Sequence, residues 1–138
     1  MSSFDETLDE EAQRRNAEVF GDDNAQRRRA ALGVVETWLH TAKRGAELRI
    51  DDADVFVVLA LKVSRLANNV FLQNIEIADA HRRRGVARAV VRLLKQWAAS
   101  KSGGTVTIQS VQSPHMEALA RNEEFTPAQA TGSWIWPR

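Results

Sequence analysis

Apolar side chains recur at two different spacings in the middle of this chain, and the change of spacing separates two elements. Within residues 70–78, Phe71, Ile75 and Ile77 stand an even number of positions apart, which is typical of a strand with one buried face. Over residues 86–99 the apolar side chains recur every three or four residues, which is typical of a helix with one buried side. The sequence therefore predicts a strand, a short turn and a helix in direct succession.

The same patterns predict the elements that precede this unit. A helix is expected over residues 24–44, because apolar side chains there share one face and Gly45 follows as a stop signal. Apolar stretches predict strands at 47–50 and 55–66, and the nearly continuous run that opens the second indicates burial on both faces. The Asn-Asn pair at 68–69 then favours a hairpin into the next strand.

Three further elements are expected after the helix. A strand is predicted at 105–111, followed by a loop and a second helix. Ser113 is a suitable N-cap for that helix, and Pro114 would occupy the first helical position, which proline favours. Residues 126–138 leave room only for a tight hairpin, whose last strand carries two tryptophans on one face.

Composition narrows the class of protein. A chain of 138 residues is large enough for one hydrophobic core and too small for two. The net charge of +1 gives no overall attraction to nucleic acid or membrane, and no apolar run approaches the length of a membrane span. The sequence has no cysteine, which excludes a thiol nucleophile, and with only three histidines it gives no support for a metal site. We therefore expect a metal-free cytoplasmic protein.

The beginning of the chain differs in charge from the rest. Residues 1–22 are strongly acidic, and residues 5–19 have a thin apolar stripe that would suit a short helix. We interpret residues 1–22 as an acidic N-terminal arm and residues 23–138 as the folded domain. The arm is either mobile or folds over a basic groove or a partner.

The turn that precedes residues 86–99 combines two small residues, Gly85 and Ala87, with a group of arginines. Glycine has no Cβ and alanine only a methyl group, so a ligand can approach the main chain here. The first N–H groups of a helix lack a partner within it and carry the positive end of its dipole. That dipole disfavours cations, so arginines at this place indicate that an anion binds. The turn is therefore predicted to bind phosphate or pyrophosphate. The arginines are Arg82, Arg83, Arg84 and Arg88.

Other interpretations of this turn stay open. One is an ordinary strand-to-helix turn with a basic surface. Another is a nucleic-acid contact made by arginines at 82–84 and 27–29, which would lose affinity steeply with salt. A P-loop is excluded because no Gly-Lys-Ser/Thr follows, and a dinucleotide-binding turn would need two more glycines.

The pattern Arg82-x-x-Gly85-x-Ala87 after a strand resembles the Gln/Arg-x-x-Gly-x-Gly/Ala signature of the GNAT superfamily, the acyl-CoA-dependent N-acyltransferases. The order of elements over residues 70–125 is also similar to that family. The resemblance implies a single α/β domain of GNAT type, with a mixed and mostly antiparallel sheet, splayed central strands and flanking helices. It further implies that acetyl-CoA, the co-substrate, binds between the splayed strands. The residues that it places at acetyl-CoA are Ile75, Ile77, Arg82, Arg83, Arg84, Gly85, Val86, Ala87, Arg88 and Ser113.

The activity implied by the resemblance is direct transfer of an acetyl group from acetyl-CoA to an amine, either a protein lysine or N-terminus or a small amine. Glu76 is the first candidate for the general base, because it lies on the central strand beside the opening. His115 is the second, since imidazole exchanges protons near neutral pH. His81 is expected to touch ligand or solvent, and His40 to be a half-buried structural residue. Family members frequently form homodimers through their last strands.

The sequence also departs from the family. GNAT proteins usually have an asparagine near the start of the helix after the splayed strand and a tyrosine in its last turn, where this chain has Ser113 and Ala120. The chain has no tyrosine at all, so the phenol that commonly protonates the departing thiolate is missing. The alternative hypothesis is therefore a catalytically weak or inactive GNAT-like protein that binds a protein partner. Its contacts would be the acidic arm, Trp134 and Trp136.

Overall fold

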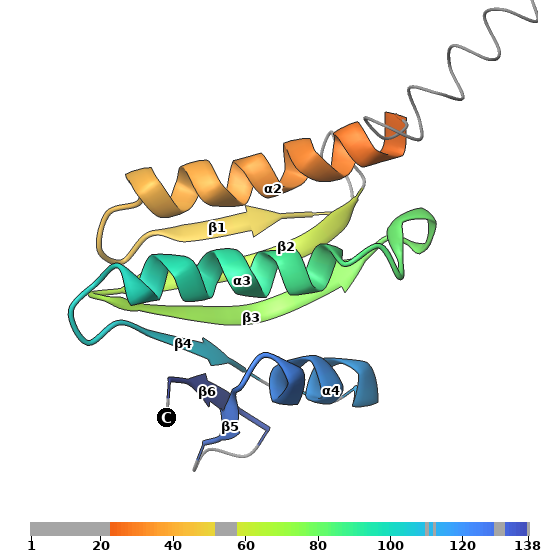
Figure 1. Ribbon diagram of the computed structural model, residues 1–138. Coiled ribbons are helices and arrows are strands. Elements are labelled where there is room, and N and C mark those ends of the chain that lie inside the picture. Colours follow the sequence, from red (N-terminus) through yellow and green to blue (C-terminus); the bar gives the residue numbers. More distant parts are fainter. Residues whose placement is uncertain (1–22, 52–57, 110, 112, 129–131, 138) are drawn as a thin grey trace, which may run out of the picture.

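Six strands form one sheet in the order β1-β2-β3-β4-β6-β5 (Figure 1). The computed structural model describes residues 23–51, 58–109, 111, 113–128 and 132–137. All neighbouring strands run antiparallel except β3 and β4, which are parallel. The sheet is therefore mixed and mostly antiparallel, as predicted. The strands are β1 (Glu47–Ile50), β2 (Leu59–Leu66), β3 (Asn69–Ile77), β4 (Thr105–Ile108), β5 (Thr126–Pro127) and β6 (Trp134–Trp136).

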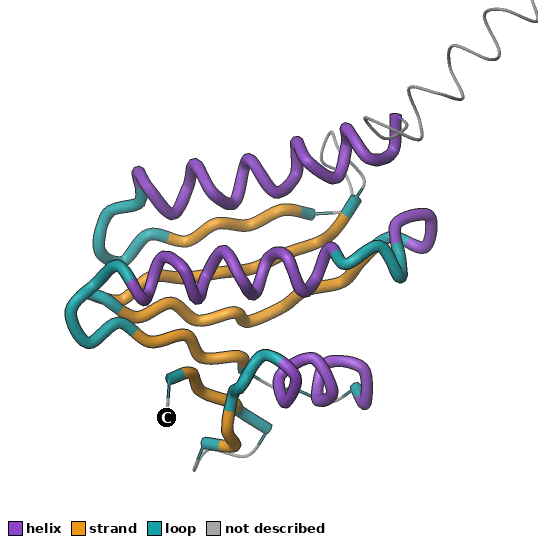
Figure 2. The backbone as a smooth tube through the Cα atoms, viewed as in Figure 1, coloured by secondary structure: helices purple, strands orange, loops and turns teal. Residues whose placement is uncertain are grey.

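Helices α2 (Asp23–Thr41) and α3 (Val86–Ala99) lie side by side along the same face of the sheet (Figures 1 and 2). Helix α3 makes the crossover that the parallel pair β3–β4 requires. Helix α4 (Pro114–Asn122) lies beyond the end of β4, and a short 3₁₀ turn, η1 (Asp79–His81), follows β3. None of the described helices is long and apolar enough to cross a membrane.

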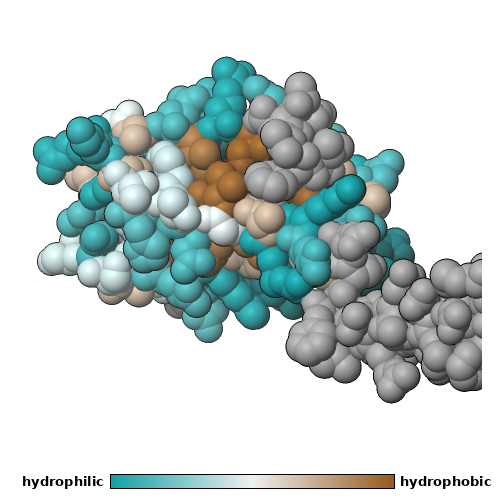
Figure 3. All heavy atoms as spheres, turned by 90° about the horizontal axis from the view of Figure 1, so that it is seen from above, coloured by the Kyte–Doolittle hydropathy of each residue, from teal (hydrophilic) through white to brown (hydrophobic). Residues whose placement is uncertain are grey.

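The core fills the space between the sheet and the helices. Val35 and Leu39 of α2 and Val90 and Leu94 of α3 are at most 4% exposed, which accounts for the apolar stripes of both helices. The sheet contributes alternate residues to the same layer, and each such side chain stabilises the fold by about 1.5–3 kcal/mol. Seen from above, as in Figure 3, one group of apolar side chains reaches the surface, and most of the other side chains visible on this face are polar. The core strand residues with the least exposure are Leu61, Val63, Val70, Leu72 and Val106.

The pairing of β2 with β3 contains a β-bulge. Lys62 pairs with Asn74 and Val63 pairs with Leu72, so Gln73 has no partner residue on β2. An extra residue in one strand reverses the faces of the residues that follow it. Leu72 and Ile75 consequently share the face of Val63 and the other buried residues of β2, although they stand three residues apart.

Several predicted elements agree with the structure. Helix α3 and strand β1 have the predicted bounds. Strand β3 begins and ends one residue earlier than predicted. The hydroxyl of Ser113 accepts a hydrogen bond from the Met116 N–H at 3.1 Å, and Pro114 is the first residue of α4. The N-cap prediction is confirmed. Strands β5 and β6 pair antiparallel, as the expected hairpin requires.

Other predictions were wrong at the ends of elements. Helix α2 stops at Thr41 rather than at 44, because the chain turns to pair with β2: the Gly45 N–H donates to the Arg65 carbonyl at 2.9 Å. Strand β4 ends at Ile108 rather than at 111, where its pairing with β3 ends. The start of the strand predicted at 55–66 and the whole acidic arm at 1–22 lie outside the described residues.

Two predicted environments were also wrong. The imidazole of His40 is 71% exposed instead of half-buried, because it lies on the outer side of α2. Its Nε2 is 4.0 Å from Oε1 of Glu36, one turn earlier in the helix. The nucleic-acid contact proposed for the arginines at 27–29 requires all three to be exposed, but Arg28 is partly buried, and only Arg27 and Arg29 are exposed.

Candidate functional site

The turn between β3 and α3 has an unusual main-chain geometry. Arg83 has φ of 61° and Gly85 has φ of 77°, so two residues of this turn adopt the left-handed conformation. The first hydrogen bond within α3 runs from the Ala89 N–H to the Gly85 carbonyl at 2.9 Å. The N–H groups of the three residues between them therefore have no partner within the helix. These residues are Val86, Ala87 and Arg88.

Gly85 is needed for its conformation and leaves open space in front of it. Side chains other than glycine are strained at this φ. A Cβ built on Gly85 would meet no atom of the protein within 4 Å, other than those of its chain neighbours. The region above the free N–H groups is thus accessible to a ligand.

Positive charge around the turn is only partly neutralised by the protein. Arg82 is held by its own turn: its Nη1 is 3.2 Å from an Asp79 carboxylate oxygen, and its Nε donates to the Ile77 carbonyl at 3.2 Å. Arg83, Arg84 and Arg88 form no salt bridge with any residue that the structure describes, and the first turn of α3 contains no acidic residue. The uncompensated cations and the free N–H groups together favour a multiply charged anion.

A hollow of about 770 Å³ lies beside this turn. One wall is the end of β3 and the turn, and the opposite wall is the first part of α4. Every residue predicted to contact the co-substrate lines it except Arg84, which is exposed elsewhere on the turn. The predicted bases Glu76 and His115 line it from opposite walls, β3 and α4 respectively.

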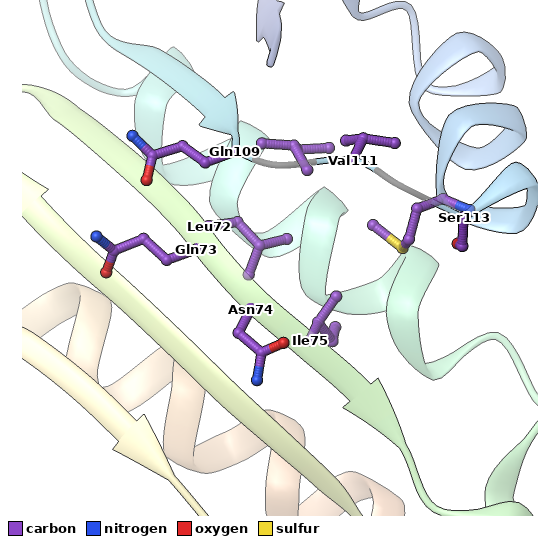
Figure 4. A pocket seen from close by; sticks show the side chains of 9 residues that line it. Leu72, Gln73, Asn74, Ile75, Gln109, Val111 and Ser113 are labelled. Carbon is purple, nitrogen blue, oxygen red and sulfur yellow. The ribbon is translucent and has the colours of Figure 1, made fainter. Parts of the chain in front are cut away.

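The parallel strands β3 and β4 separate beside a second hollow. Their pairing extends only to Leu72 and Ile108, and the last hydrogen bond between them runs from the Gln109 N–H to the Leu72 carbonyl at 2.9 Å. A cavity of about 200 Å³ occupies the fork that follows (Figure 4). Both hollows are lined by Ile75, Ser113 and Met116, so the fork adjoins the hollow beside the basic turn.

The sequence model of the acetyltransferase (GNAT) family matches residues 45–122, more than half of the chain. The protein belongs to the GNAT family. The matched segment begins just before β1 and ends with α4, so it contains the basic turn, the fork and both walls of the larger hollow.

Solved GNAT structures have a similar fold. The PaiA N-acetyltransferase of Thermoplasma acidophilum, solved in complex with coenzyme A, is 9% identical over 72% of this chain and 63% of its own, with a TM-score of 0.50. The ribosomal-protein-S18-alanine N-acetyltransferase of Escherichia coli is 15% identical over 69% and 68%, with a TM-score of 0.49. An acetyltransferase from Thermus thermophilus is 17% identical over 74% and 70%, with a TM-score of 0.48. No protein of curated function matches by sequence.

Within this GNAT site, the two predicted bases have different surroundings. Glu76 is exposed on β3, where it pairs with Ala60 of β2. His115 is exposed in the first turn of α4. The Ser113 hydroxyl already accepts the α4 capping hydrogen bond, so its hydrogen remains for a ligand.

His81 is buried, at 4% exposure, so of the two expected contacts, ligand or solvent, the structure leaves only the ligand. It lines the hollow from η1, and its Nδ1 is 3.3 Å from Nη1 of Arg28. The contact joins helix α2 to the beginning of the GNAT turn.

The tryptophans proposed as partner contacts are less available than the sequence implied. Trp134 is only 8% exposed, with the Arg121 guanidinium 5.4 Å from its ring centre. Trp136 is half-buried, and the Lys95 ammonium lies 5.1 Å from its ring centre. A pair of exposed aromatic anchors is thus absent from this part of the GNAT domain as the structure describes it.

Sequence reasoning missed the residues of the fork. Gln73, Gln109 and Val111 line it, yet none of them belongs to a motif. The only signal for Gln73 would have been the β-bulge, which depends on the pairing with β2 and leaves no pattern in the sequence of β3. Among the described residues, no group of three or more acidic, histidine or cysteine side chains could hold a metal ion.

Proposed function

We propose that this GNAT protein transfers an acetyl group from acetyl-CoA to an amine. The observation that carries the proposal is that the hollow beside the free N–H groups of α3 adjoins the fork between β3 and β4. A pyrophosphate would accept hydrogen bonds from Val86, Ala87 and Arg88, with the uncompensated arginines near its remaining charge. The acyl arm would then lie along β3 beside Ile75 and Ile77, where main-chain groups are available to pair with its amides.

The reaction that fits this arrangement is direct transfer. The lone pair of the neutral amine attacks the thioester carbon, a C–N bond forms, and the C–S bond breaks with its electron pair going to sulfur. The nitrogen loses one proton and the thiolate takes up one, which gives an amide and free CoA. The sequence has no cysteine to carry the acetyl group, so a ternary complex is the simpler route. Placing the two reactants side by side can supply much of the rate gain.

Glu76 is the base that we propose for the attacking amine, either directly or through one water. It lies on β3 between Ile75 and Ile77, and it lines the hollow where the acyl arm would pass. His115 on the opposite wall is the second candidate. With no tyrosine in the sequence, the thiolate takes its proton from water, which is chemically acceptable because a thiolate is a good leaving group.

Calorimetry with acetyl-CoA tests the proposal. The wild type is expected to bind, and Gly85→Glu is expected to bind no ligand, because it brings a negative side chain to the pyrophosphate position. Gly103→Glu is a matched control: Gly103 also has a positive φ, 65°, and open space around it, but it lies after α3 and away from the hollow. This control should retain the wild-type affinity. Absence of heat for the wild type at millimolar acetyl-CoA, or equal loss in both variants, would refute the proposal.

A further inference from the structure

Strand β1 is an edge of the sheet. Among the described strands it pairs with β2 alone, so one of its two hydrogen-bonding sides has no strand beside it. The Arg65 N–H donates to the Ala46 carbonyl at 2.9 Å, which fixes the phase of the ladder. Because hydrogen-bonded pairs alternate along antiparallel strands, Leu48 also bonds to β2. The main-chain groups of Glu47 and Arg49 therefore point away from β2, where a further strand could pair with them.

The charges on β1 complement those of a second copy. If two β1 strands pair antiparallel about a twofold axis at Leu48, Glu47 of each copy lies directly opposite Arg49 of the other. These are the residues whose main-chain groups point outward, so the same register also forms hydrogen bonds between the strands. Opposite charges in directly facing positions stabilise a strand pair, and like charges destabilise it. Displacing the strands by two residues in either direction would bring two glutamates or two arginines face to face.

The single chain leaves these two charges poorly compensated. Arg49 lies directly opposite Lys62 of β2, which is a like charge. The Arg49 Nε is 3.6 Å from an Asp51 carboxylate oxygen, but both side chains are 66% exposed, so this contact contributes little. Glu47 is exposed and forms no salt bridge with any residue that the structure describes. A second copy would place Glu47 on the free side of Arg49 and would thereby compensate both charges.

Apolar side chains extend the same surface onto α2. Val34 and Trp38 stand one turn apart on the side of α2 opposite Leu32 and Glu36, which line a groove shared with α3. Both are half-buried, as is Leu48 at the centre of the β1 register. Helix α2 and β1 are uppermost in Figure 1, and the view from above in Figure 3 shows a group of apolar side chains at the surface. Pairing of two β1 strands would bring two α2 helices together and cover such side chains.

We propose that β1 and the adjoining side of α2 form an interface between two copies of this chain, in which the β1 strands pair antiparallel about Leu48. The partner is a second copy because the charges and the outward hydrogen-bonding groups complement themselves under one twofold rotation. This edge lies at the other end of the sheet from the last strands, through which the family resemblance implies pairing. The inference does not depend on the proposed acetyl transfer. The basic turn and the fork lie at β3 and β4, so both would stay open to ligand in such a dimer.

Reversal and exchange of the two charges test the register. Sedimentation equilibrium of the full chain gives the dimer dissociation constant for the wild type, for Glu47→Arg, for Arg49→Glu and for the variant that carries both substitutions. Each single substitution places like charges opposite each other twice in the dimer, whereas the double variant restores two pairs of opposite charges. Lys101→Glu is the matched control, because it reverses one exposed charge in the loop after α3.

The wild type is expected to dimerise in the micromolar range, and each single variant about tenfold or more weakly. The double variant and Lys101→Glu should dimerise within about threefold of the wild type. Hydrogen exchange resolved by residue locates the interface. The N–H groups of Glu47 and Arg49 should exchange more slowly as the protein concentration rises, whereas that of Leu48, which bonds to β2, should already be slow in the monomer.

A wild type that stays monomeric at millimolar concentration would overturn the inference. A dimer whose stability is the same in the single variants, or which the double variant fails to restore, would do so as well. Fast exchange of the Glu47 and Arg49 N–H groups in a dimer would place the interface elsewhere, such as at the last strands. Slow exchange of the same groups in a monomer would show that this edge is covered within one chain, which also contradicts the proposal.

Discussion

Nε of Arg92 lies 3.0 Å from Oε1 of Glu123, and this pair joins α3 to the end of α4. Arg92 is 59% exposed, while the Glu123 side chain is only 7% exposed. Lys95 adds a hydrogen bond from its Nζ to the Glu123 carbonyl at 2.7 Å. The two helices that carry the opposite walls of the candidate site are thus connected on one side by a buried carboxylate.

This pair gives the fold a defined sensitivity to acid. The hydrogen bond from Arg92 lowers the pKa of the Glu123 carboxyl below its usual value, against the opposing effect of burial. A carboxyl whose pKa is lower in the folded state contributes its stability above the unfolded pKa of about 4.3, and this contribution is lost as the pH falls through the folded pKa. Glu123→Gln should lower the melting temperature by about 3 °C at neutral pH and should flatten the acid decline of the wild type.

Glu117→Gln is the control for this prediction. Glu117 also forms a salt bridge, with Arg121 at 2.7 Å, but both side chains are substantially exposed on α4. Exposed pairs of this kind contribute little, so this variant should melt like the wild type. Equal melting temperatures for the two variants across the pH range would contradict the role of Glu123.

Two glycines should respond to alanine in opposite directions. A Cβ on Gly104 would lie 2.1 Å from the Ala98 carbonyl oxygen. This oxygen belongs to the main chain, which can move away only at a large cost in free energy. Gly104→Ala should therefore destabilise the protein by about 2–4 kcal/mol. Gly33 lies inside α2 with no atom within 4 Å of such a Cβ, so Gly33→Ala should stabilise it by about 0.5–1 kcal/mol. Chemical denaturation measures both, and a shift of the same sign in both variants would be inconsistent with this packing.

Binding of acetyl-CoA should depend on the unpaired arginines of the basic turn. We expect Arg83→Gln and Arg88→Gln each to weaken binding about three- to tenfold at low salt, because each removes one charge from the phosphate region. The effect should shrink as ionic strength rises. Arg44→Gln is the matched control, since Arg44 is an exposed arginine distant in sequence from the turn and outside both hollows. If the control loses as much affinity, the turn is not the phosphate site.

Glu76→Gln should separate chemistry from binding. Loss of a general base typically slows turnover by about a hundredfold or more, and the affinity for acetyl-CoA should stay unchanged. Release of free thiol from acetyl-CoA with a panel of primary amines measures turnover, and His115→Gln is compared in the same assay. A large loss for His115→Gln with little change for Glu76→Gln would transfer the role of base to His115.

The sequence was most informative where residues close together in the chain determine the local structure. The bounds of α3 followed from its apolar spacing, and the start of α4 followed from Ser113 and Pro114, because these signals act within a single turn of helix. The basic turn was recognisable because Gly85 and the arginines are adjacent in sequence.

Features that depend on distant pairing were not predictable from the sequence. The bulge at Gln73 exists only relative to β2, and the early end of β4 exists only relative to β3. The burial of His81 was not predictable, because nothing near it in sequence reveals that Arg28, 53 residues earlier, lies against it. The fork residues were missed for the same reason.

The short pairing of β3 with β4 has a consequence for the cooperativity of unfolding. Only four residue pairs of the described strands join β3 to β4, and thereby the two halves of the sheet, from Asn69 with Thr105 to Leu72 with Ile108. A molecule that lies in the fork and forms hydrogen bonds to both strands would connect the two halves of the sheet beyond these four pairs. Occupancy of the fork should therefore make the two halves unfold as one unit and raise the melting temperature with ligand concentration.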